Sequence, residues 1–207
     1  KGKINLAEGQ PFALDIALDP GAGNEKEVGC AYKDLVKDVK AGDTLLLADG
    51  YIVLEVTSVK GTRIETITRA GGELSNRKGL NKLGGGLSLG ALTERDRELI
   101  TIAAQLGADF IAVSFCRNAE DMNEARRVAR AAGSDAWLVA KVERAEAIEN
   151  LVEIVDASDV VMVARGDLGV EIGDAELPGL QKKIIRTSLE RNKIVITATQ
   201  MLQSMVS

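Results

Sequence analysis

The sequence predicts an α/β protein in two parts, an all-β region followed by a region of alternating strands and helices. Short β-prone runs separated by Gly, Asn and Lys fill the first 82 residues. From residue 84 onward, apolar strands alternate with helical stretches. These strands recur about every 25 to 35 residues, a spacing that suits the βα units of a barrel.

The clearest element of the first region is a hairpin. Asp49 and Gly50 lie between two strand-prone runs, residues 44–48 and 51–56. Both residues tolerate the positive φ that a two-residue hairpin turn requires, so the pair is a strong turn signal. Together with further short strands, the hairpin predicts a small barrel or sandwich. These further strands span residues 12–18, 28–31 and 63–68.

The second region is expected to form a parallel sheet. Short apolar strands that alternate with helices are typical of parallel sheets buried on both faces. An early helix opens at Thr93, and Asp96 stands three residues later, which resembles a capping box. The expected strands span residues 110–115, 137–142, 160–164 and 194–198, and the longer helical stretches span residues 119–132 and 178–191.

Three consecutive glycines, Gly84 to Gly86, divide the two regions. Glycine accepts a wide range of φ and ψ, so the segment can serve as a hinge between two moving parts. The same residues suit a rigid turn that needs positive φ. Both interpretations stay open at the level of sequence.

The composition excludes several kinds of chemistry. The 207 residues contain no histidine, which removes Ser-His and Cys-His nucleophilic mechanisms. Cys30 and Cys116 lie far apart with no CxxC spacing, so neither a disulfide framework nor a zinc site is expected, and a reducing cytoplasm is the simpler location. A net charge of -5 without a basic stripe argues against nucleic-acid binding, and no apolar run is long enough for a transmembrane helix.

Polar residues end or follow each expected strand of the second region. Chemistry in barrels and open α/β folds gathers at the C-terminal ends of the strands. The recurrence of polar residues at the same end of successive strands is therefore the main evidence for a functional site. These residues are Ser114, Lys141 with Glu143, Arg165 with Gly166 and Asp167, and Thr199 with Gln200.

Lys141, Glu143 and Asp167 have the composition of a magnesium-dependent phosphoryl-transfer site. Lys141 and Glu143 are two residues apart, so they project from the same face of a strand. Two carboxylates from adjacent strand ends suit Mg²⁺, which takes oxygen ligands and keeps positions for water and substrate phosphate. A lysine beside them would place positive charge on the transferring phosphoryl group. A buried ion pair between Lys141 and either carboxylate is the structural alternative.

The residues after the third and fourth strands could bind an anion. The N–H groups from Gly166 and Asp167 onward belong to a short helical turn and could hold a carboxylate or a phosphate. The Thr199 hydroxyl could contact the same ligand, although it would equally suit a position lining a barrel.

Three longer segments resemble the signature segments of pyruvate kinase, and most closely those of the bacterial type II enzymes. They are VAKVE at residues 139–143, MVARGDLGVEI at residues 162–172 and ITATQMLQSM at residues 196–205. Two shorter matches support them, AVSF at residues 112–115 and KGLN at residues 78–81. The resemblance covers the whole chain, and the segment 162–172 is highly specific.

The resemblance implies a (β/α)8 TIM barrel interrupted by a small all-β lid domain and followed by a regulatory domain. Residues 1–83 would form the lid, and residues 84–207 would form a partial barrel of about four βα units. The first three barrel strands and the eighth have no counterpart, and the chain opens with Lys1, so a central portion of a longer protein is expected. The resemblance implies a homotetramer for that longer protein.

The implied reaction transfers the phosphoryl group of phosphoenolpyruvate to ADP in glycolysis, giving pyruvate and ATP, with Mg²⁺ and K⁺ as cofactors. By resemblance, Glu143 and Asp167 ligate Mg²⁺, and Lys141 stabilises the phosphoryl group during transfer. The backbone at Gly166 and Asp167, together with Thr199, would hold the substrate carboxylate. Thr199 would also lie near the enolate carbon that gains a proton.

The chain departs from the family pattern in the lid. The paired Asp-Asp-Gly of the lid hairpin appears as Ala48-Asp49-Gly50, so one lid carboxylate is absent. Arg77 precedes Lys78 where many members carry a first lysine, and Lys78 is the expected nucleotide contact. The K⁺ site and several substrate-binding segments fall outside this chain, so the chain alone is expected to have negligible kinase activity.

Two other functions stay open. A magnesium-dependent lyase or aldolase acting through a pyruvate enolate uses a similar barrel and a similar Lys-x-Glu strand end. The expected lid and the uninterrupted residues 165–172 argue against it. A non-catalytic folding or interaction module would show a cooperative melt without a shift in the presence of Mg²⁺.

Overall fold

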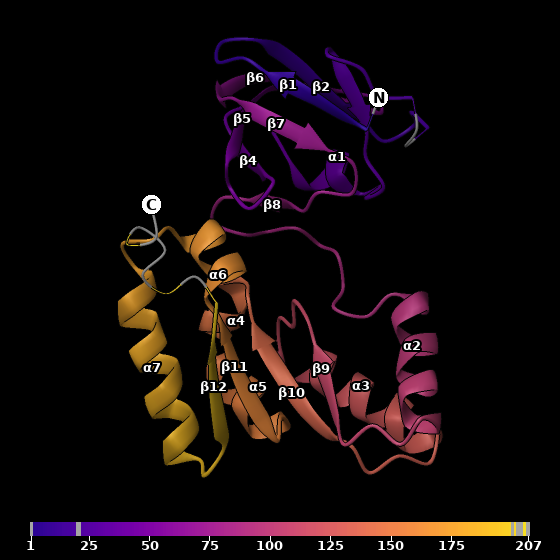
Figure 1. The fold of residues 1–207 in the computed structure, drawn as a ribbon, viewed down its shortest axis with the longest axis vertical. Helices are drawn as coiled ribbons and strands as arrows, with labels where there is room; N and C mark the ends of the chain where they lie inside the picture. Colours follow the sequence, from indigo (N-terminus) through magenta and orange to yellow (C-terminus); the bar gives the residue numbers. More distant parts are fainter. Residues whose placement is uncertain (1, 20–21, 200, 202–204, 206–207) are drawn as a thin grey trace. The chain divides into compact units, whose positions relative to one another are not determined.

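The computed structural model describes residues 2–19, 22–199, 201 and 205. The chain divides into two compact units, unit 1 from Lys1 to Leu89 and unit 2 from Gly90 to Ser207 (Figure 1). Each unit has its own cluster of buried hydrophobic side chains. Within the described part of the chain, none of the helices has the length and apolar character needed to cross a membrane.

Unit 1 is a β domain with one short helix. Six strands pair in the order β3-β2-β6-β5-β4-β8, and β1 pairs with β7 in a separate two-stranded sheet. The described residues therefore form two sheets, and the six-stranded sheet is open, with β3 and β8 at its edges. The elements are β1 (Lys3–Leu6), β2 (Pro11–Asp15), β3 (Glu27–Gly29), α1 (Leu35–Asp38), β4 (Thr44–Leu47), β5 (Ile52–Lys60), β6 (Arg63–Ala70), β7 (Gly72–Ser75) and β8 (Leu80–Lys82).

The predicted hairpin is present, but its loop is longer than expected. Strands β4 and β5 pair antiparallel, and residues 48–51 connect them. Ala48, Asp49 and Gly50 have φ values of 51°, 59° and 85°, and the Tyr51 N–H donates to the Ala48 carbonyl at 3.2 Å. The prediction of a two-residue turn was wrong, because Ala48 also adopts a left-handed conformation and leaves the strand.

The three glycines of residues 84–86 form a turn within unit 1. Their φ values are 80°, 75° and 89°, and the Gly85 N–H donates to the Lys82 carbonyl at 2.9 Å. Beyond the turn, the Ser88 N–H donates to the Asp38 carboxylate of α1 at 2.7 Å. These contacts support the interpretation as a turn that needs positive φ. The hinge role stays a prediction.

Unit 2 contains a four-stranded parallel sheet with helical crossovers (Figure 1). The strand order β12-β11-β10-β9 makes sequential strands neighbours, as in successive βα units of a (β/α)8 barrel. The elements are α2 (Glu94–Gln105), β9 (Phe110–Val113), α3 (Ala119–Ala131), β10 (Trp137–Val142), α4 (Ala145–Glu149), α5 (Leu151–Ala157), β11 (Val160–Ala164), α6 (Arg165–Ile172), α7 (Leu177–Glu190) and β12 (Ile194–Ala198).

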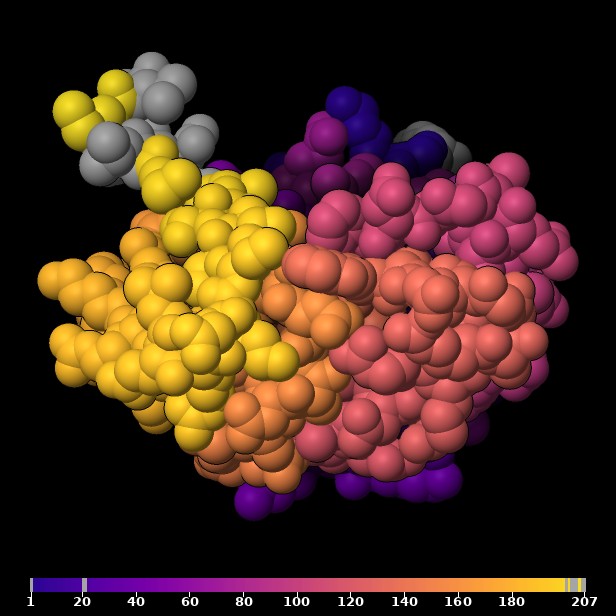
Figure 2. Space-filling view, turned by 90° about the horizontal axis from the view of Figure 1, so that it is seen from below, coloured from indigo at the N-terminus to yellow at the C-terminus, as the bar shows by residue number. Residues whose placement is uncertain are grey.

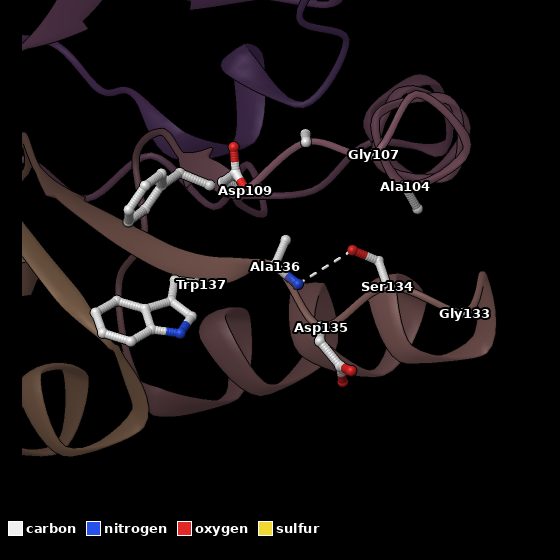
Figure 3. Close-up of a pocket in the computed structure, with 10 residues that line it drawn as sticks. Ala104, Gly107, Asp109, Gly133, Ser134, Asp135, Ala136 and Trp137 are labelled. Atoms are coloured by element: carbon white, nitrogen blue, oxygen red, sulfur yellow. Dashed lines mark hydrogen bonds between the residues drawn. The ribbon is translucent and has the colours of Figure 1, made fainter.

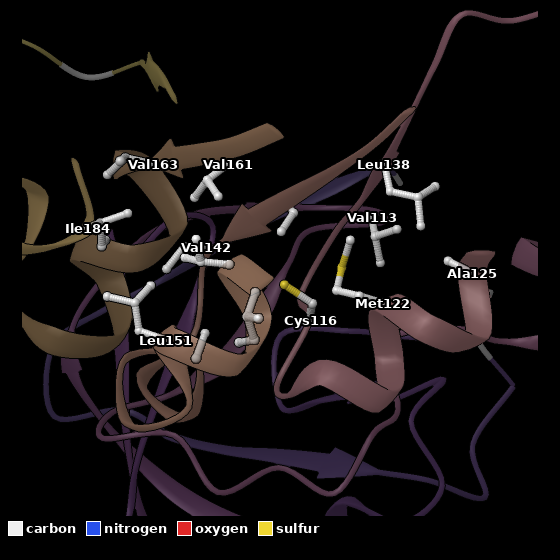
Figure 4. Close-up of a cluster of buried hydrophobic side chains, with 14 of the residues drawn as sticks. Val113, Cys116, Met122, Ala125, Leu138, Val142, Leu151, Val161, Val163 and Ile184 are labelled. Atoms are coloured by element: carbon white, nitrogen blue, oxygen red, sulfur yellow. The ribbon is translucent and has the colours of Figure 1, made fainter. Parts of the chain in front are cut away.

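The core of unit 2 lies between the sheet and its helices (Figure 4). Val113 of β9 and Leu138 of β10 pack in one buried cluster with Met122 of α3. On the other face of the sheet, Phe110 is 57% exposed and Ile194 is 52% exposed. The prediction that both faces are buried was therefore wrong for the described residues. Four strands of an eight-stranded barrel leave the inner face without the strands that would lie across from it.

Helix α2 begins with the capping box that Thr93 and Asp96 predict. The Asp96 N–H donates to Thr93 Oγ1 at 3.2 Å, and the Thr93 N–H donates to Asp96 Oδ2 at 2.8 Å. Two N–H groups at the helix start are thereby satisfied by side chains.

We expect Thr93→Ala to lower the free energy of unfolding by about 1 kcal/mol, because the helix loses its N-cap acceptor. Urea denaturation of the chain followed by circular dichroism measures this change. Thr93→Ser keeps the hydroxyl and should retain most of the stability. Indistinguishable midpoints for Thr93→Ala and the unsubstituted chain would contradict a stabilising cap.

Candidate functional site

The polar residues predicted at the strand ends lie along one edge of the parallel sheet. All four strands run in the same direction, so their C-terminal ends share that edge. Lys141 belongs to β10 and Glu143 follows the strand directly. Asp167 lies in the first turn of α6, which begins where β11 ends. Ser114 and Thr199 directly follow β9 and β12.

Lys141 and Glu143 form an ion pair at this edge. Lys141 Nζ lies 2.6 Å from Glu143 Oε1 and donates a second hydrogen bond to Ser114 Oγ at 3.1 Å. The Glu143 side chain is 1% exposed, whereas that of Lys141 is 26% exposed. The ion pair considered as the structural alternative is thus present. It fixes the ammonium group and still leaves it partly accessible to a ligand.

A backbone group also holds Glu143. The Phe115 N–H donates to Glu143 Oε2 at 2.8 Å. Phe115 has a φ of 55°, a left-handed conformation that is uncommon for a bulky residue. Strand β9 ends at Val113, two residues before the predicted limit. The sequence does not predict this hydrogen bond, because it depends on a left-handed backbone conformation at Phe115, and a phenylalanine gives no indication of that conformation.

Asp167 acts on the same carboxylate electrostatically. Burial raises the pKa of Glu143, hydrogen bonds from Lys141 and Phe115 oppose the shift, and the negative charge of Asp167 adds to it. Two carboxylates that repel one another fit a hard divalent cation such as Mg²⁺, which keeps several waters. Over the described residues, no group of three or more His, Cys, Asp or Glu side chains is placed to hold a metal.

The start of α6 adds groups that suit an anion. Gly166 and Asp167 lie in the first turn of this eight-residue helix, where N–H groups have no carbonyl partner within the helix. The helix dipole favours negative charge at the same end. Glu171, in the last turn of α6, accepts the Ala145 N–H at 2.9 Å. This bond joins α6 to the segment after β10, which carries Glu143.

Thr199 and Lys78 are placed differently from the other predicted site residues. Thr199 is exposed and has a φ of 58°, a costly conformation for a β-branched residue and one often found at functional sites. Gln200 lies outside the described residues. Lys78 is an exposed residue of unit 1, in the loop before β8. The cluster of strand-end residues is therefore built from unit 2 alone.

A cavity of about 550 Å³ in unit 2 lies at the opposite ends of the strands from Lys141 (Figure 3). Its lining includes Phe110 and Trp137, the first residues of β9 and β10, whose rings make a T-shaped contact at 6.0 Å. Figure 2 shows unit 2 from this side, where the helix-to-strand loops gather. In barrel folds this end contributes stability and the other end contributes chemistry, so the cavity is not the candidate active site.

Comparison with known proteins finds matches among pyruvate kinases. The family model described as "Pyruvate kinase, barrel domain" matches residues 1–207. The chain is 56% identical over 209 residues to pyruvate kinase of Haemophilus influenzae, and 56% identical over 210 residues to pyruvate kinase II of Salmonella typhimurium. Each of these two matches covers 100% of this chain and 44% of the relative.

A more distant relative shows the same partial coverage. Pyruvate kinase of Thermotoga maritima is 43% identical over 203 residues, which cover 98% of this chain and 43% of the relative. The chain thus spans less than half the length of the curated relatives that it matches.

Proposed function

The chain belongs to the pyruvate kinase family, and from this premise we propose that its strand-end site transfers the phosphoryl group of phosphoenolpyruvate to ADP within a longer protein. The observation that carries the proposal is the 2.6 Å contact between Lys141 Nζ and Glu143, at the edge where Asp167 acts on the same carboxylate. One cation and two carboxylates at parallel strand ends are the groups that phosphoryl transfer requires.

Lys141 is the residue that we assign to the phosphoryl group during transfer. Glu143 and Ser114 hold its ammonium group in place before any substrate binds. A positive charge that is already oriented stabilises the developing transition state without the reorganisation that water would need. Lys141 would therefore stabilise the negative charge that develops in the transition state as the phosphoryl group leaves the enolate oxygen.

Glu143 and Asp167 are the residues that would hold Mg²⁺. When bound, the ion supplies positive charge to phosphate oxygens. The N–H groups of Gly166 and Asp167 would hold the substrate carboxylate, and Thr199 would lie near the enolate carbon that gains a proton. Lys78 would contact the nucleotide from unit 1. The K⁺ site, the cytoplasmic location and the homotetramer are further parts of this proposal for the longer protein.

We expect the chain of 207 residues to show negligible kinase activity by itself. The inner face of its sheet exposes Phe110 and Ile194, and the groups that complete a barrel and its substrate site are not among the described residues. An assay that couples pyruvate formation to a dehydrogenase that reduces pyruvate, with ADP, Mg²⁺ and K⁺ present, measures the turnover.

The matched control is a protein that carries this chain together with the flanking segments that complete the length of its relatives. That protein should turn over phosphoenolpyruvate in the same assay. Normal turnover by the 207-residue chain would contradict the expectation that other segments complete the site. Absence of turnover in the longer protein would contradict the proposed function itself.

A further inference from the structure

Glu171 is a buried carboxylate to which the proposed function gives no role. The residue is 3% exposed and lies in the last turn of α6. Carboxylates are seldom buried so completely unless they hold a partner. One oxygen, Oε2, accepts the Ala145 N–H at 2.9 Å. Since the two residues are 26 positions apart, this hydrogen bond joins two separate elements, α6 and the start of α4.

The hydrogen bond supplies a cap that α4 does not provide for itself. Ala145 is the first residue of this five-residue helix, where N–H groups have no carbonyl partner within the helix. Arg144 occupies the N-cap position and makes no side-chain capping hydrogen bond. Glu171 takes over that function from another helix, and its negative charge suits a helix start. It thereby fixes the point at which the chain turns from β10 into α4.

The same side of α6 carries Asp167. Asp167 and Glu171 are four residues apart in this helix, so they are neighbours on its surface. The negative charge of Asp167 acts on the Glu143 carboxylate, whereas Glu171 binds the chain two residues after Glu143. Helices α4 and α6 contact one another (Figure 1). Helix α6 therefore interacts with the segment after β10 at two points, which together fix the separation of Glu143 from Asp167.

We propose that Glu171 is a positioning residue for the divalent cation, because the hydrogen bond that it accepts from Ala145 holds Glu143 and Asp167 at the separation that the ion needs. This inference rests on the proposed function, which assigns those two carboxylates to Mg²⁺, and it adds the residue that spaces them. Glu143 is already held from another side, since the Phe115 N–H donates to its Oε2 at 2.8 Å. Without the contact from Glu171, the segment after β10 would move and the ion would bind more weakly.

Two substitutions of Glu171 in the longer protein separate the reach of the side chain from its charge. Glu171→Asp keeps the negative charge but withdraws the carboxylate by one methylene group, so the bond to Ala145 is lost. Glu171→Gln removes the charge but keeps an oxygen at the same reach. Titration of Mn²⁺ followed by electron paramagnetic resonance should show about tenfold weaker binding for Glu171→Asp, as for groups that support metal ligands elsewhere. Binding by Glu171→Gln should stay close to that of the unsubstituted protein.

A third variant breaks the same hydrogen bond from the donor side. Ala145→Pro removes the N–H, and proline suits the first position of a helix. Arg144 has a φ of -120° and a ψ of 152°, the extended conformation that a residue before proline prefers. Ala145→Pro should weaken Mn²⁺ binding as Glu171→Asp does. In both variants, hydrogen-deuterium exchange of the α4 peptide should become faster in the metal-free protein, and urea denaturation checks that each variant folds.

Thr93→Ala is the matched control, because it removes the N-cap acceptor of α2 and should lower stability without changing Mn²⁺ affinity. Unchanged Mn²⁺ affinity in Glu171→Asp and Ala145→Pro would overturn the proposal. An equal loss in Glu171→Gln would overturn it too, since charge and not reach would then be the cause. So would an equal loss in Thr93→Ala, because any destabilisation would then suffice. If the longer protein shows the expected differences in Mn²⁺ binding but forms no ATP, the positioning role stands and the proposed function fails.

Discussion

Replacement of Lys141 by methionine in the longer protein should lower kcat by roughly a thousandfold or more, since even one neutral hydrogen-bond donor to a transition state contributes a hundred- to thousandfold. Methionine keeps an unbranched side chain of similar length but carries no charge. The contacts that disappear are those of Nζ with Glu143 Oε1 at 2.6 Å and with Ser114 Oγ at 3.1 Å. Steady-state kinetics with saturating phosphoenolpyruvate and ADP measure the loss.

The fold should survive this substitution largely intact. Glu143 keeps the hydrogen bond from the Phe115 N–H, and it can take up a proton, because burial already raises its pKa. A thermal melt checks the fold, and the matched control Lys182→Met removes an exposed lysine of α7. Lys141→Arg should recover part of the activity by restoring the charge. Turnover near that of the unsubstituted protein for Lys141→Met would rule out the role assigned to this residue.

The strand-end site could be predicted because its main elements are local in sequence. Strands β10, β11 and β12 have the bounds that their apolar runs predict, and each is followed at once by polar residues. The two-residue spacing of Lys141 and Glu143 places them on one face, and the ion pair at 2.6 Å follows from that spacing. The contribution of Phe115 could not be predicted, because it depends on a backbone conformation and not on a side chain.

Features that depend on distant segments were harder to predict. Strands β1 and β7 pair Lys3 with Ser75, and neither four-residue strand has a strong pattern of its own. Strand β8 and helix α1 are also too short to give a periodic signal. The inner face of the parallel sheet is exposed because the strands that would lie across from it in a closed barrel are not among the four strands of this sheet. No local stretch of sequence predicts this exposure.

The second large effect concerns the metal. Glu143→Gln in the longer protein should raise the Mg²⁺ concentration needed for half-maximal activity by at least roughly tenfold to a hundredfold, because loss of a group that merely supports a metal ligand already has an effect of that size. The substitution removes one of the two carboxylates and leaves Asp167 to hold the cation without it. The glutamine carbonyl can still accept the Phe115 N–H, which now bonds Glu143 Oε2 at 2.8 Å. The loss should therefore fall on metal binding more than on folding.

Because Glu143 is buried, Glu143→Gln should change the free energy of unfolding only a little. The effect on metal affinity can therefore be measured separately from the effect on stability. A carboxylate that is 1% exposed loses much of its hydration, so a neutral amide removes that cost at the same time as it removes the attraction to Lys141. Titration of Mn²⁺ followed by electron paramagnetic resonance measures metal affinity without turnover, and a urea melt measures stability. The control Glu120→Gln alters an exposed carboxylate of α3 that pairs with Arg127. An unchanged Mn²⁺ affinity in Glu143→Gln would exclude Glu143 as a metal ligand, because nothing else in the substitution could compensate for the lost charge.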